Sequence, residues 1–369
     1  MRVIMLSTDR KIFEPNSAVA NRMIEYGKVL GDLQIIVFAG HFMTRKLSDQ
    51  VTIYSTNSWS QLFYIPSAIN LIIKLNQQKR TDWISAQDPF ETGLAAWIAN
   101  IFVKTKLQFQ LHTDVFSPFF AKSSFLNQCR VVLAKFLLSR ADRVRVVSQK
   151  IFKSLVDGPL NLVSKKVIVL PVFVDIEEHK NEEVTVDLKQ KYSQFEKIIL
   201  MASRFELEKD FSTALRAFKQ IVSKRSKVGM IIVGAGSKRG KIKDLIKSLG
   251  LTTNVIIEPW SDNLFSYFKT ADIYLLTSVF EGYSRTLIEA SIAGTPFVST
   301  DVGCARELAD LGIFCKVVSV GDREAISGAL EFLLEKSDNE KPEEIVLPDS
   351  IHFLSKEKFL ELYRQSFEE

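Results

Sequence analysis

Two glutamates stand eight positions apart around the predicted start of a short helix, Glu281 in the preceding turn and Glu289 within the helix. Because one carboxylate precedes the helix and the other lies about a turn into it, both can accept hydrogen bonds from hydroxyls in one crevice. The free N–H groups and positive dipole of a helix N-terminus offer a neighbouring site to an anion. A phosphorylated sugar carries both kinds of group, and the residues expected around it are Gly282, Tyr283, Ser284, Arg285 and Thr286.

The elements that position this pair are a strand, a polar turn, a helix and a second strand. Residues 273–277 are nearly all apolar and do not alternate, which predicts a parallel strand buried on both faces. Gly294 and Pro296 end the helix, and residues 297–300 form the next strand. Ligands of open α/β sheets bind outside the carboxyl ends of the strands, so the turn is expected at a binding crevice.

Two cations follow another predicted strand, at residues 197–203: Arg204 comes directly after it and Lys209 comes five residues later. The fork of an arginine and the point charge of a lysine suit a diphosphate leaving group. The structural alternative leaves both as exposed surface charges. In the same way, Glu281 could be a helix-start charge worth about 0.3–1 kcal/mol, and Glu289 part of a solvated face.

A glycine-rich turn, Gly234-Ala-Gly236, follows the predicted strand at residues 229–233. The third glycine, Gly240, comes one position too late for the G-x-G-x-x-G fingerprint of nicotinamide-binding proteins. The first strand of neither predicted domain is followed by that fingerprint. The turn therefore does not indicate a dehydrogenase.

The spacing of Glu281 and Glu289 resembles the E-x7-E signature of the family 4 retaining glycosyltransferases, also called glycosyl transferases group 1, which have the GT-B fold. The resemblance continues through Gly294, Pro296, Asp301, Gly303 and Glu307. It implies that Glu281 holds hydroxyls of the donor sugar and that Glu289 holds the ribose of the nucleotide.

The other motifs extend the resemblance. Arg204 and Lys209 match the family's G-R-x4-K-G segment, whose cations hold the donor diphosphate, although Asp210 replaces the last glycine. Gly234 and Gly236 match a turn that lines the nucleotide site in the family.

The N-terminal half matches the family more loosely. His112 ends the predicted strand at 107–112 and matches a family histidine beside the donor sugar; alternatively it is a structural residue with satisfied hydrogen bonds. Ser17 is a predicted helix N-cap in the loop after the first strand, where the family usually has a Gly-Gly pair. That pair is absent here, and the N–H groups after Ser17 are expected to serve as the anion site.

No D-x-D triplet occurs in the sequence. Glycosyltransferases of the other common fold typically hold the donor diphosphate through a metal at such a motif. We expect no metal and no cofactor here: cations and the helix dipole would hold a UDP- or GDP-linked sugar, which is a substrate.

Length and composition favour two ordinary globular domains. The chain has 369 residues, 46% of them hydrophobic and 25% charged, and a net charge of +5. Residues 1–7 are expected to form a first strand rather than a signal peptide, and no apolar stretch is long enough to span a bilayer. Three cysteines without paired spacing are expected to be reduced. These features predict a cytoplasmic protein, in a peripheral position at the inner face of the membrane if it binds lipid.

Two series of apolar runs predict two parallel sheets covered by helices. The first comprises residues 2–7, 33–39, 51–55, 82–86, 107–112, 142–147 and 167–170, and the second 197–203, 229–233, 254–258, 272–277, 296–300 and 314–318. We expect an acceptor-side domain at 1–175 and a nucleotide-sugar domain at 176–350, with residues 176–195 as a polar linker. The GT-B resemblance implies that the domains face each other across a cleft and that the helix in 351–369 crosses back to the N-terminal domain.

Residues 115–153 interleave aromatic and aliphatic side chains with basic ones. One interpretation is a surface that touches anionic lipid, and the alternative is a packed helix with a solvated basic rim. No recognised motif supports binding to nucleic acid. The basic residues are Lys122, Arg130, Lys135, Arg140, Arg143, Arg145 and Lys150.

Together these features predict a retaining glycosyltransferase that moves a sugar from a nucleotide-diphosphate donor to the hydroxyl of a glycan or lipid-linked acceptor, in the synthesis of cell-surface polysaccharide or glycolipid. Two alternatives stay open: a nucleotide-sugar epimerase of the same architecture, and a sugar-binding protein without turnover. The binding protein's usual periplasmic form would need an export signal.

Overall fold

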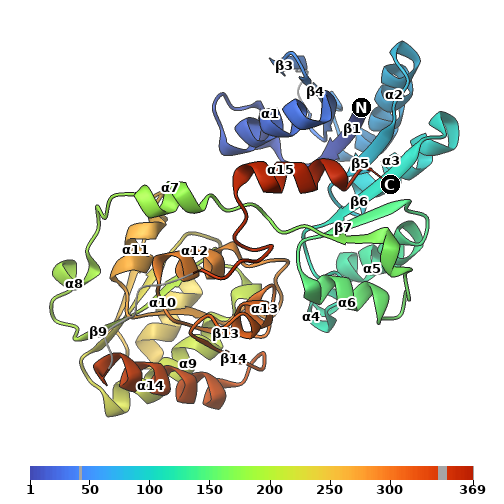
Figure 1. The fold of residues 1–369 in the computed structure, drawn as a ribbon. Helices are drawn as coiled ribbons and strands as arrows, with labels where there is room; N and C mark the ends of the chain where they lie inside the picture. The colour runs from blue at the N-terminus through green and yellow to red at the C-terminus, as the bar shows by residue number, and fades with distance from the viewer. Residues whose placement is uncertain (41–43, 340–346, 369) are drawn as a thin grey trace. The chain divides into compact units, whose positions relative to one another are not determined.

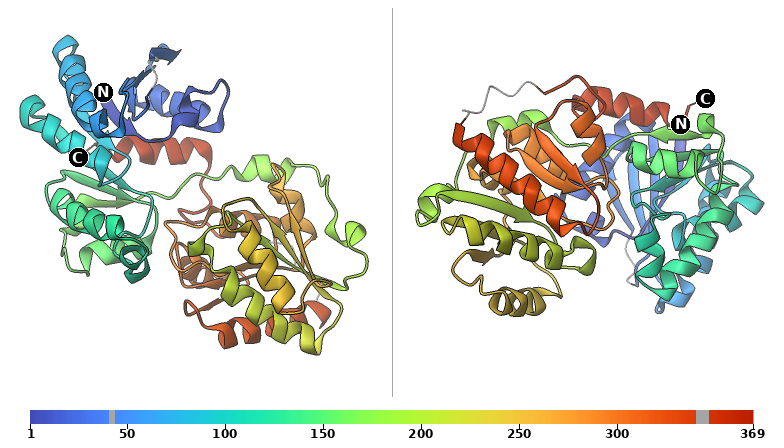
Figure 2. Two further views of the ribbon diagram at one scale, coloured as in Figure 1. Left: turned by 180° about the vertical axis from the view of Figure 1, so that it is seen from behind. Right: turned by 90° about the horizontal axis from the view of Figure 1, so that it is seen from below.

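The computed structural model describes residues 1–40, 44–339 and 347–368. The chain forms two compact units, one of Met1–Pro171 with Lys356–Glu369 and one of Val172–Ser355. Each unit has a central sheet with helices on both faces, as Figures 1 and 2 show. The predicted α/β class is confirmed for both units.

The sheet of the first unit has the strand order β3-β4-β2-β1-β5-β6-β7-β8. All neighbouring strands are parallel except β3 and β4. The strands are β1 (Arg2–Ser7), β2 (Asp32–Val37), β3 (Thr44–Ser48), β4 (Val51–Ser55), β5 (Trp83–Ala86), β6 (Lys106–Leu111), β7 (Arg143–Val146) and β8 (Val167–Val169). The helices are α1 (Ala18–Leu30), α2 (Tyr64–Gln78), α3 (Glu91–Val103), α4 (Pro118–Lys122), α5 (Phe125–Leu138), α6 (Gln149–Val156) and α15 (Lys356–Gln365).

The second unit contains a six-stranded parallel sheet in the order β11-β10-β9-β12-β13-β14. Its strands are β9 (Lys197–Ala202), β10 (Val228–Val233), β11 (Val255–Glu258), β12 (Ile273–Leu276), β13 (Phe297–Thr300) and β14 (Cys315–Val318). Its helices are α7 (Ile176–Asn181), α8 (Leu188–Lys191), α9 (Phe211–Lys224), α10 (Arg239–Ser248), α11 (Leu264–Thr270), α12 (Arg285–Ala293), α13 (Ala305–Asp310) and α14 (Arg323–Asn339).

The core of the second unit explains why its strands lack polar alternation. Helices α9 and α14 lie side by side on one face of the sheet, and α7, α11 and α12 lie together on the other (Figure 1). Side chains from both helix layers therefore meet strands that are buried on both faces. Phe218 of α9 and Leu330 of α14 are fully buried against Ile199 and Ile232 of the sheet.

The order of strands places a reversal between β9 and β12, which are neighbours in the sheet although β10 and β11 intervene in the sequence. From β9 the chain proceeds to one edge of the sheet and then returns to build the other side. The loops that leave the carboxyl ends of β9 and β12 therefore diverge over a crevice. This topology brings residues 203–210 next to residues 277–284.

One strand was not predicted, and one predicted linker is not a linker. The unpredicted β3 is an antiparallel edge strand with the sequence Thr-Arg-Lys-Leu-Ser, whose polar side chains suit an exposed edge. The segment at 176–195, interpreted as an interdomain linker, belongs to the second unit. Its helix α7 packs on α12, and Leu188 of α8 is fully buried. A few buried apolar residues, spaced among many charged ones, are enough to attach the segment 176–195 to the second unit.

The C-terminal helix α15 lies in the first unit and packs on α1. Tyr363 of α15 stacks on Tyr26 of α1 with a centroid distance of 3.8 Å, and Phe367 packs edge-on against Trp83 at 5.8 Å. The observed units divide after Pro171 and after Ser355, close to the predicted boundaries at 175 and 350.

Candidate functional site

The loops after β9 and β12 bring Lys209 and Glu281 together in an ion pair. Their side chains are 12% and 17% exposed, so the pair is only partly open to solvent. The Ser278 hydroxyl also donates to Glu281, over 2.7 Å. The two loops are tied by the Thr277 hydroxyl, which donates to the carbonyl of Lys209 over 2.8 Å. A carboxylate and an ammonium group are thus fixed side by side at the edge where ligands of such sheets bind.

Helix α12 starts directly after this pair. Ser284, its N-cap, has a left-handed backbone with φ of 72°, and its hydroxyl oxygen is buried and finds no hydrogen-bond partner among the described residues. Gly303 approaches the turn so closely that a Cβ there would lie 2.5 Å from the carbonyl oxygen of Tyr283. The first N–H groups of a helix have no partner within it, so the N-terminus of α12 can donate to an anion. Gly282, Arg285 and Thr286, which the sequence predicted as binding residues, lie at this same turn and helix start.

Glu289 is buried rather than solvated, with 8% of its surface exposed. Burial raises the pKa of its carboxyl group, while the nearby guanidinium of Arg285, 3.0 Å away, acts in the opposite direction. Burial chiefly raises the pKa of the Tyr274 hydroxyl, and the negative charges of Glu281 and Glu289 raise it further. Tyr274 also donates to the Thr286 hydroxyl over 2.7 Å. Glu281 precedes α12 and Glu289 lies within it, so the two glutamates flank one helix start.

Arg204 lies at the protein surface, unlike Lys209. Its side chain is 73% exposed and pairs with Glu208 at 3.2 Å. The Gly234–Gly236 turn packs against the same loop: the N–H of Phe205 donates to the Ala235 carbonyl over 2.8 Å. A Cβ at Gly234 would lie 2.0 Å from the carbonyl oxygen of Ser203, so this contact requires glycine. The structure thus brings the predicted cation loop and the predicted glycine turn together.

Asp210 explains one departure from the family pattern. It stands where the family has glycine, and it adopts the left-handed conformation with φ of 43°. Its side chain accepts from the N–H of Thr213 over 3.2 Å and from the Thr213 hydroxyl over 2.6 Å. Aspartate tolerates this conformation and caps helix α9 in return. The replacement therefore preserves the turn that presents Lys209.

A buried histidine that the sequence did not indicate supports the turn before α12. His352 is 6% exposed and lies 3.0 Å from the Tyr283 hydroxyl and 3.1 Å from a carboxylate oxygen of Glu307. These three residues come from the α12 turn, from α13 and from the segment before α15. Their separation in sequence left no local signal that they would meet.

The first unit holds the other two predicted site residues. Ser17 caps α1, accepting from the N–H of Ala20 over 3.2 Å, and its hydroxyl donates to the Lys11 carbonyl over 2.8 Å. His112 follows β6 and is exposed. The surrounding protein, with the positive charges of Arg145 and Arg22, lowers the pKa of His112 below its usual value. The lowered pKa makes the ring neutral at pH 7.

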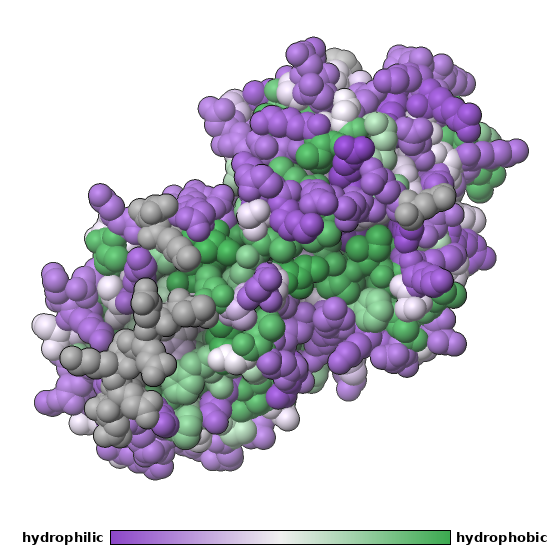
Figure 3. Space-filling view, viewed as in Figure 1, coloured by the Kyte–Doolittle hydropathy of each residue, from purple (hydrophilic) through white to green (hydrophobic). Residues whose placement is uncertain are grey.

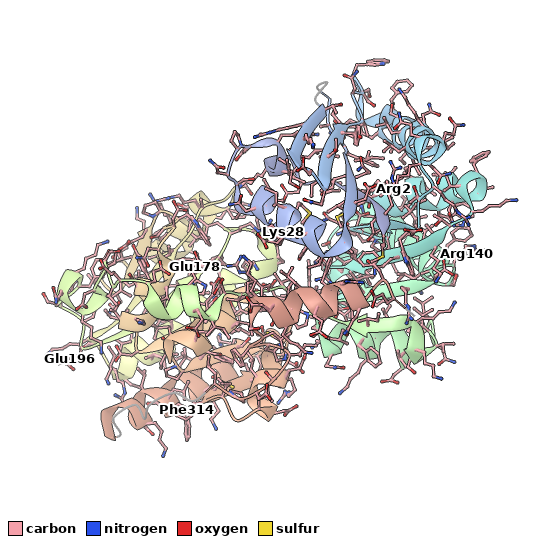
Figure 4. The ribbon with its side chains drawn as sticks, turned by 45° about the horizontal axis from the view of Figure 1, so that its top comes forward. Arg2, Lys28, Arg140, Glu178, Glu196 and Phe314 are labelled. Carbon is pink, nitrogen blue, oxygen red and sulfur yellow. The ribbon has the colours of Figure 1, made fainter. Side chains whose placement is uncertain are left out.

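Helices α4 to α6 carry the basic and aromatic segment. Phe125 and Val132 of α5 are 78% and 69% exposed, and Arg140, marked in Figure 4, is exposed at its end. Arg130 is engaged by Glu91 at 2.8 Å. Arg145 does not belong to this surface, because only 3% of it is exposed. On the face shown in Figure 3, hydrophobic residues are interspersed among hydrophilic ones.

Comparison with known proteins identifies the second unit. The model of the family described as "Glycosyl transferases group 1" matches residues 187–346, which lie within the second unit. The second unit is a group 1 glycosyltransferase domain. The motifs at Glu281, Glu289, Arg204 and Lys209 all lie within the matched residues, so the family predicted from them is confirmed.

The relatives that this chain matches have low identity to it. The N-acetylgalactosamine-N,N'-diacetylbacillosaminyl-diphospho-undecaprenol 4-alpha-N-acetylgalactosaminyltransferase of Campylobacter jejuni is 26% identical over 220 residues, covering 59% of this chain and 58% of the relative. The N-acetyl-alpha-D-glucosaminyl L-malate synthase of Bacillus anthracis is 26% identical over 276 residues, covering 71% and 69%. The match thus spans little more than half of the first relative and about two thirds of the second.

A solved structure extends the likeness to both units. HepE of Anabaena, in complex with UDP and glucose, matches with a TM-score of 0.71 at 17% identity, covering 92% of this chain and 91% of that protein. The predicted GT-B fold is therefore confirmed for the chain.

Proposed function

We propose that the protein is a retaining glycosyltransferase that uses a nucleotide-diphosphate sugar as donor. The observation that carries the proposal is the pair Glu281 and Glu289 around the start of α12, with Lys209 held against Glu281. Its support from known proteins is the family match over these residues and the UDP and glucose bound to HepE. In this assignment Glu281 accepts from donor-sugar hydroxyls and Glu289 from the ribose.

The reaction we propose proceeds on one face of the sugar. The bond from the anomeric carbon to the diphosphate oxygen breaks as the acceptor oxygen forms its bond from the same side, and the departing diphosphate oxygen takes the acceptor proton. Lys209, Arg204 and the N–H groups at the start of α12 stabilise the negative charge that develops on the diphosphate. Arg204 has to leave Glu208 to do so, which its exposed position allows.

Product formation tests the proposal against both alternatives. The chain is incubated with UDP- and GDP-linked sugars, with and without glycan and lipid-linked acceptors, and the release of nucleoside diphosphate is followed. Release that depends on an acceptor, with retained configuration in the product, is the expected result. A changed donor sugar without any acceptor would indicate an epimerase, and binding without release would indicate a sugar-binding protein.

We expect transfer to survive chelation, because Lys209 and the α12 N-terminus supply positive charge to the diphosphate. The measurement compares initial rates of transfer in the untreated protein and after dialysis against EDTA. Equal rates are the expected result. Transfer that disappears with EDTA and returns with magnesium or manganese would show that the diphosphate is held through a metal.

We also propose that the first unit touches anionic lipid through α5. The exposed side chains of Phe125, Leu126 and Val132 accompany the exposed base Lys135 on this helix and the exposed Arg140 just after its end. Each basic residue near an anionic surface contributes about 1 kcal/mol, and apolar side chains add to it by entering the interface. No helix among the described residues has the length and apolar character needed to cross a bilayer. A lipid-linked acceptor would fit such a surface.

Sedimentation with vesicles tests this contact. We expect binding to anionic vesicles at low salt, weaker binding at high salt because salt screens the charges, and little binding to neutral vesicles. Phe125→Ser with Leu126→Ser should reduce binding, whereas Phe314→Ser, at a 52% exposed phenylalanine of the second unit (Figure 4), should not. Equal binding to both vesicle types, or none to either, would indicate that Lys135 and Arg140 belong to a solvated basic rim that does not bind lipid.

A further inference from the structure

A buried arginine, for which the described residues provide no carboxylate partner, shares the Gln110 side-chain oxygen with His112. Arg145 of β7 is 3% exposed, and the structure records no ion pair for it among the described residues. Its Nη1 donates to the Gln110 side-chain oxygen over 3.1 Å, and its guanidinium stands 5.2 Å from the ring centroid of Tyr363. A buried guanidinium stays charged and can only donate hydrogen bonds. The Gln110 amide must therefore turn its oxygen, and not its nitrogen, toward Arg145.

The other end of the same hydrogen-bond chain is fixed by a carbonyl. Gln108 donates to the Ser366 carbonyl of the C-terminal segment over 3.0 Å, so its side-chain oxygen faces inward. That oxygen accepts from the Ser85 hydroxyl over 3.0 Å. The amide nitrogen of Gln110 in turn donates to Ser85 over 2.9 Å. The Ser366 carbonyl can only accept and the Arg145 guanidinium can only donate, so together they set the direction of donation along the whole chain of hydrogen bonds. The positions of the oxygen and nitrogen in both glutamine amides follow from this direction.

This direction determines the proton position on His112. Its Nε2 lies 3.3 Å from the same Gln110 oxygen that accepts from Arg145. Since an amide oxygen cannot donate, Nε2 must carry the hydrogen for the contact to be a hydrogen bond. The ring is neutral at pH 7, so Nδ1 is left with a free lone pair.

We propose that Arg145 is a positioning residue: through Gln110 it holds His112 in the Nε2–H tautomer, so that Nδ1 accepts a hydrogen bond from a hydroxyl of the sugar substrate. The assignment of the hydroxyl rests on the proposed function, whereas the tautomer rests on the hydrogen-bond chain alone. Burying a charge without a counter-ion costs desolvation free energy. Fixing the proton on Nε2 of His112 gives Arg145 a role that a neutral residue could not fill as reliably.

The tautomer is read directly by two-bond 1H–15N correlation spectra of the full chain labelled at histidine, recorded above the pKa of the ring. His112→Gln assigns the signals. We expect a protonated Nε2 and an unprotonated Nδ1 in the wild type. In Arg145→Met, the Gln110 oxygen loses its donor and only the Ser85 end of the chain still orients the amide, so we expect the pattern of a tautomer mixture. Removal of a positive charge should also raise the pKa of His112 toward its usual value.

Two further variants separate orientation from charge and from folding. Arg22→Met removes the other positive charge that acts on His112 and leaves Gln110 in place, so it should shift the pKa in the same direction without changing the tautomer. Gln110→Glu keeps an acceptor oxygen for both Arg145 and the Nε2 of His112, so the Nε2–H tautomer should persist in it. This variant tests the proposal independently if Arg145→Met does not fold. Loss of that tautomer in folded Gln110→Glu would count against the proposal.

The wild-type spectrum decides the matter. An Nδ1–H tautomer in the wild type, or an unchanged Nε2–H pattern in folded Arg145→Met, would overturn the inference. A wild type with the expected tautomer that transfers no sugar from any donor would instead contradict the proposed function and leave the role of Arg145 intact.

Discussion

Replacing Glu281 with alanine is expected to lower turnover about 100-fold, the scale seen when one fixed polar contact to a transition state is removed. Affinity for the nucleoside diphosphate should change little, because the carboxylate contacts the sugar rather than the nucleotide in this account. The change also leaves Lys209, which is only 12% exposed, without its partner. Steady-state rates and calorimetric titration of the nucleoside diphosphate together measure both effects.

The matched control for this variant is Glu331→Ala. Glu331 of α14 also pairs with a lysine, Lys224 of α9, on the helix-covered face of the same unit. It should leave turnover unchanged. A Glu281→Ala protein that transfers sugar at the wild-type rate would remove Glu281 from the site, and a loss of nucleotide affinity equal to the loss of turnover would move its contact from the sugar to the nucleotide.

Replacing Glu289 with alanine is expected to weaken binding of the nucleoside diphosphate roughly 10- to 100-fold. Hydrogen bonds to a charged group contribute about 1.5–3 kcal/mol, and each 1.4 kcal/mol corresponds to a factor of ten in affinity. Glu289 is buried beside Arg285, so little water competes for its oxygens. Isothermal titration calorimetry gives the two dissociation constants directly.

The conservative variant Glu289→Gln distinguishes a ribose contact from a purely structural one. Glutamine keeps one acceptor oxygen and the shape of the side chain, so it should lose less affinity than alanine. Equal affinity in wild type and Glu289→Ala would remove the ribose assignment. A lower melting temperature of Glu289→Ala with unchanged affinity for the nucleoside diphosphate would show that Glu289 stabilises the fold through its ion pair with Arg285 and does not contact the ribose.

The strands and the site motifs could be predicted because their signals are local. Parallel strands buried on both faces appear as continuous apolar runs, and every predicted run is a strand in the structure. Arg204, Lys209 and Glu281 lie in the loops that leave such runs, and Glu289 lies in the helix that follows, so topology brings them to one edge of the sheet. The linker prediction for 176–195 was wrong because a charge-rich sequence hides the few residues, such as Leu188, that anchor it.

Contacts between distant segments could not be predicted in this way. Arg143 and Arg145 alternate with valines in β7, a pattern typical of a strand with one solvated face. The face of Arg145 is instead covered by α15, which comes from the far end of the chain, and Tyr363 lies against the guanidinium. His352 reaches Tyr283 from a segment 69 residues further along the chain. Such polar contacts depend on the assembled domain, and no spacing in the sequence encodes them.

Hydrogen–deuterium exchange with and without a saturating nucleoside diphosphate tests the central claim most directly, since it needs no acceptor. The account predicts slower exchange in the loops after β9 and β10, at residues 203–210 and 234–238, and at residues 281–289, which end the loop after β12 and begin α12. This protection should be lost in Glu289→Ala at the same nucleotide concentration. Nucleotide binding that leaves all three segments unprotected, or that protects only residues elsewhere in the chain, would contradict it.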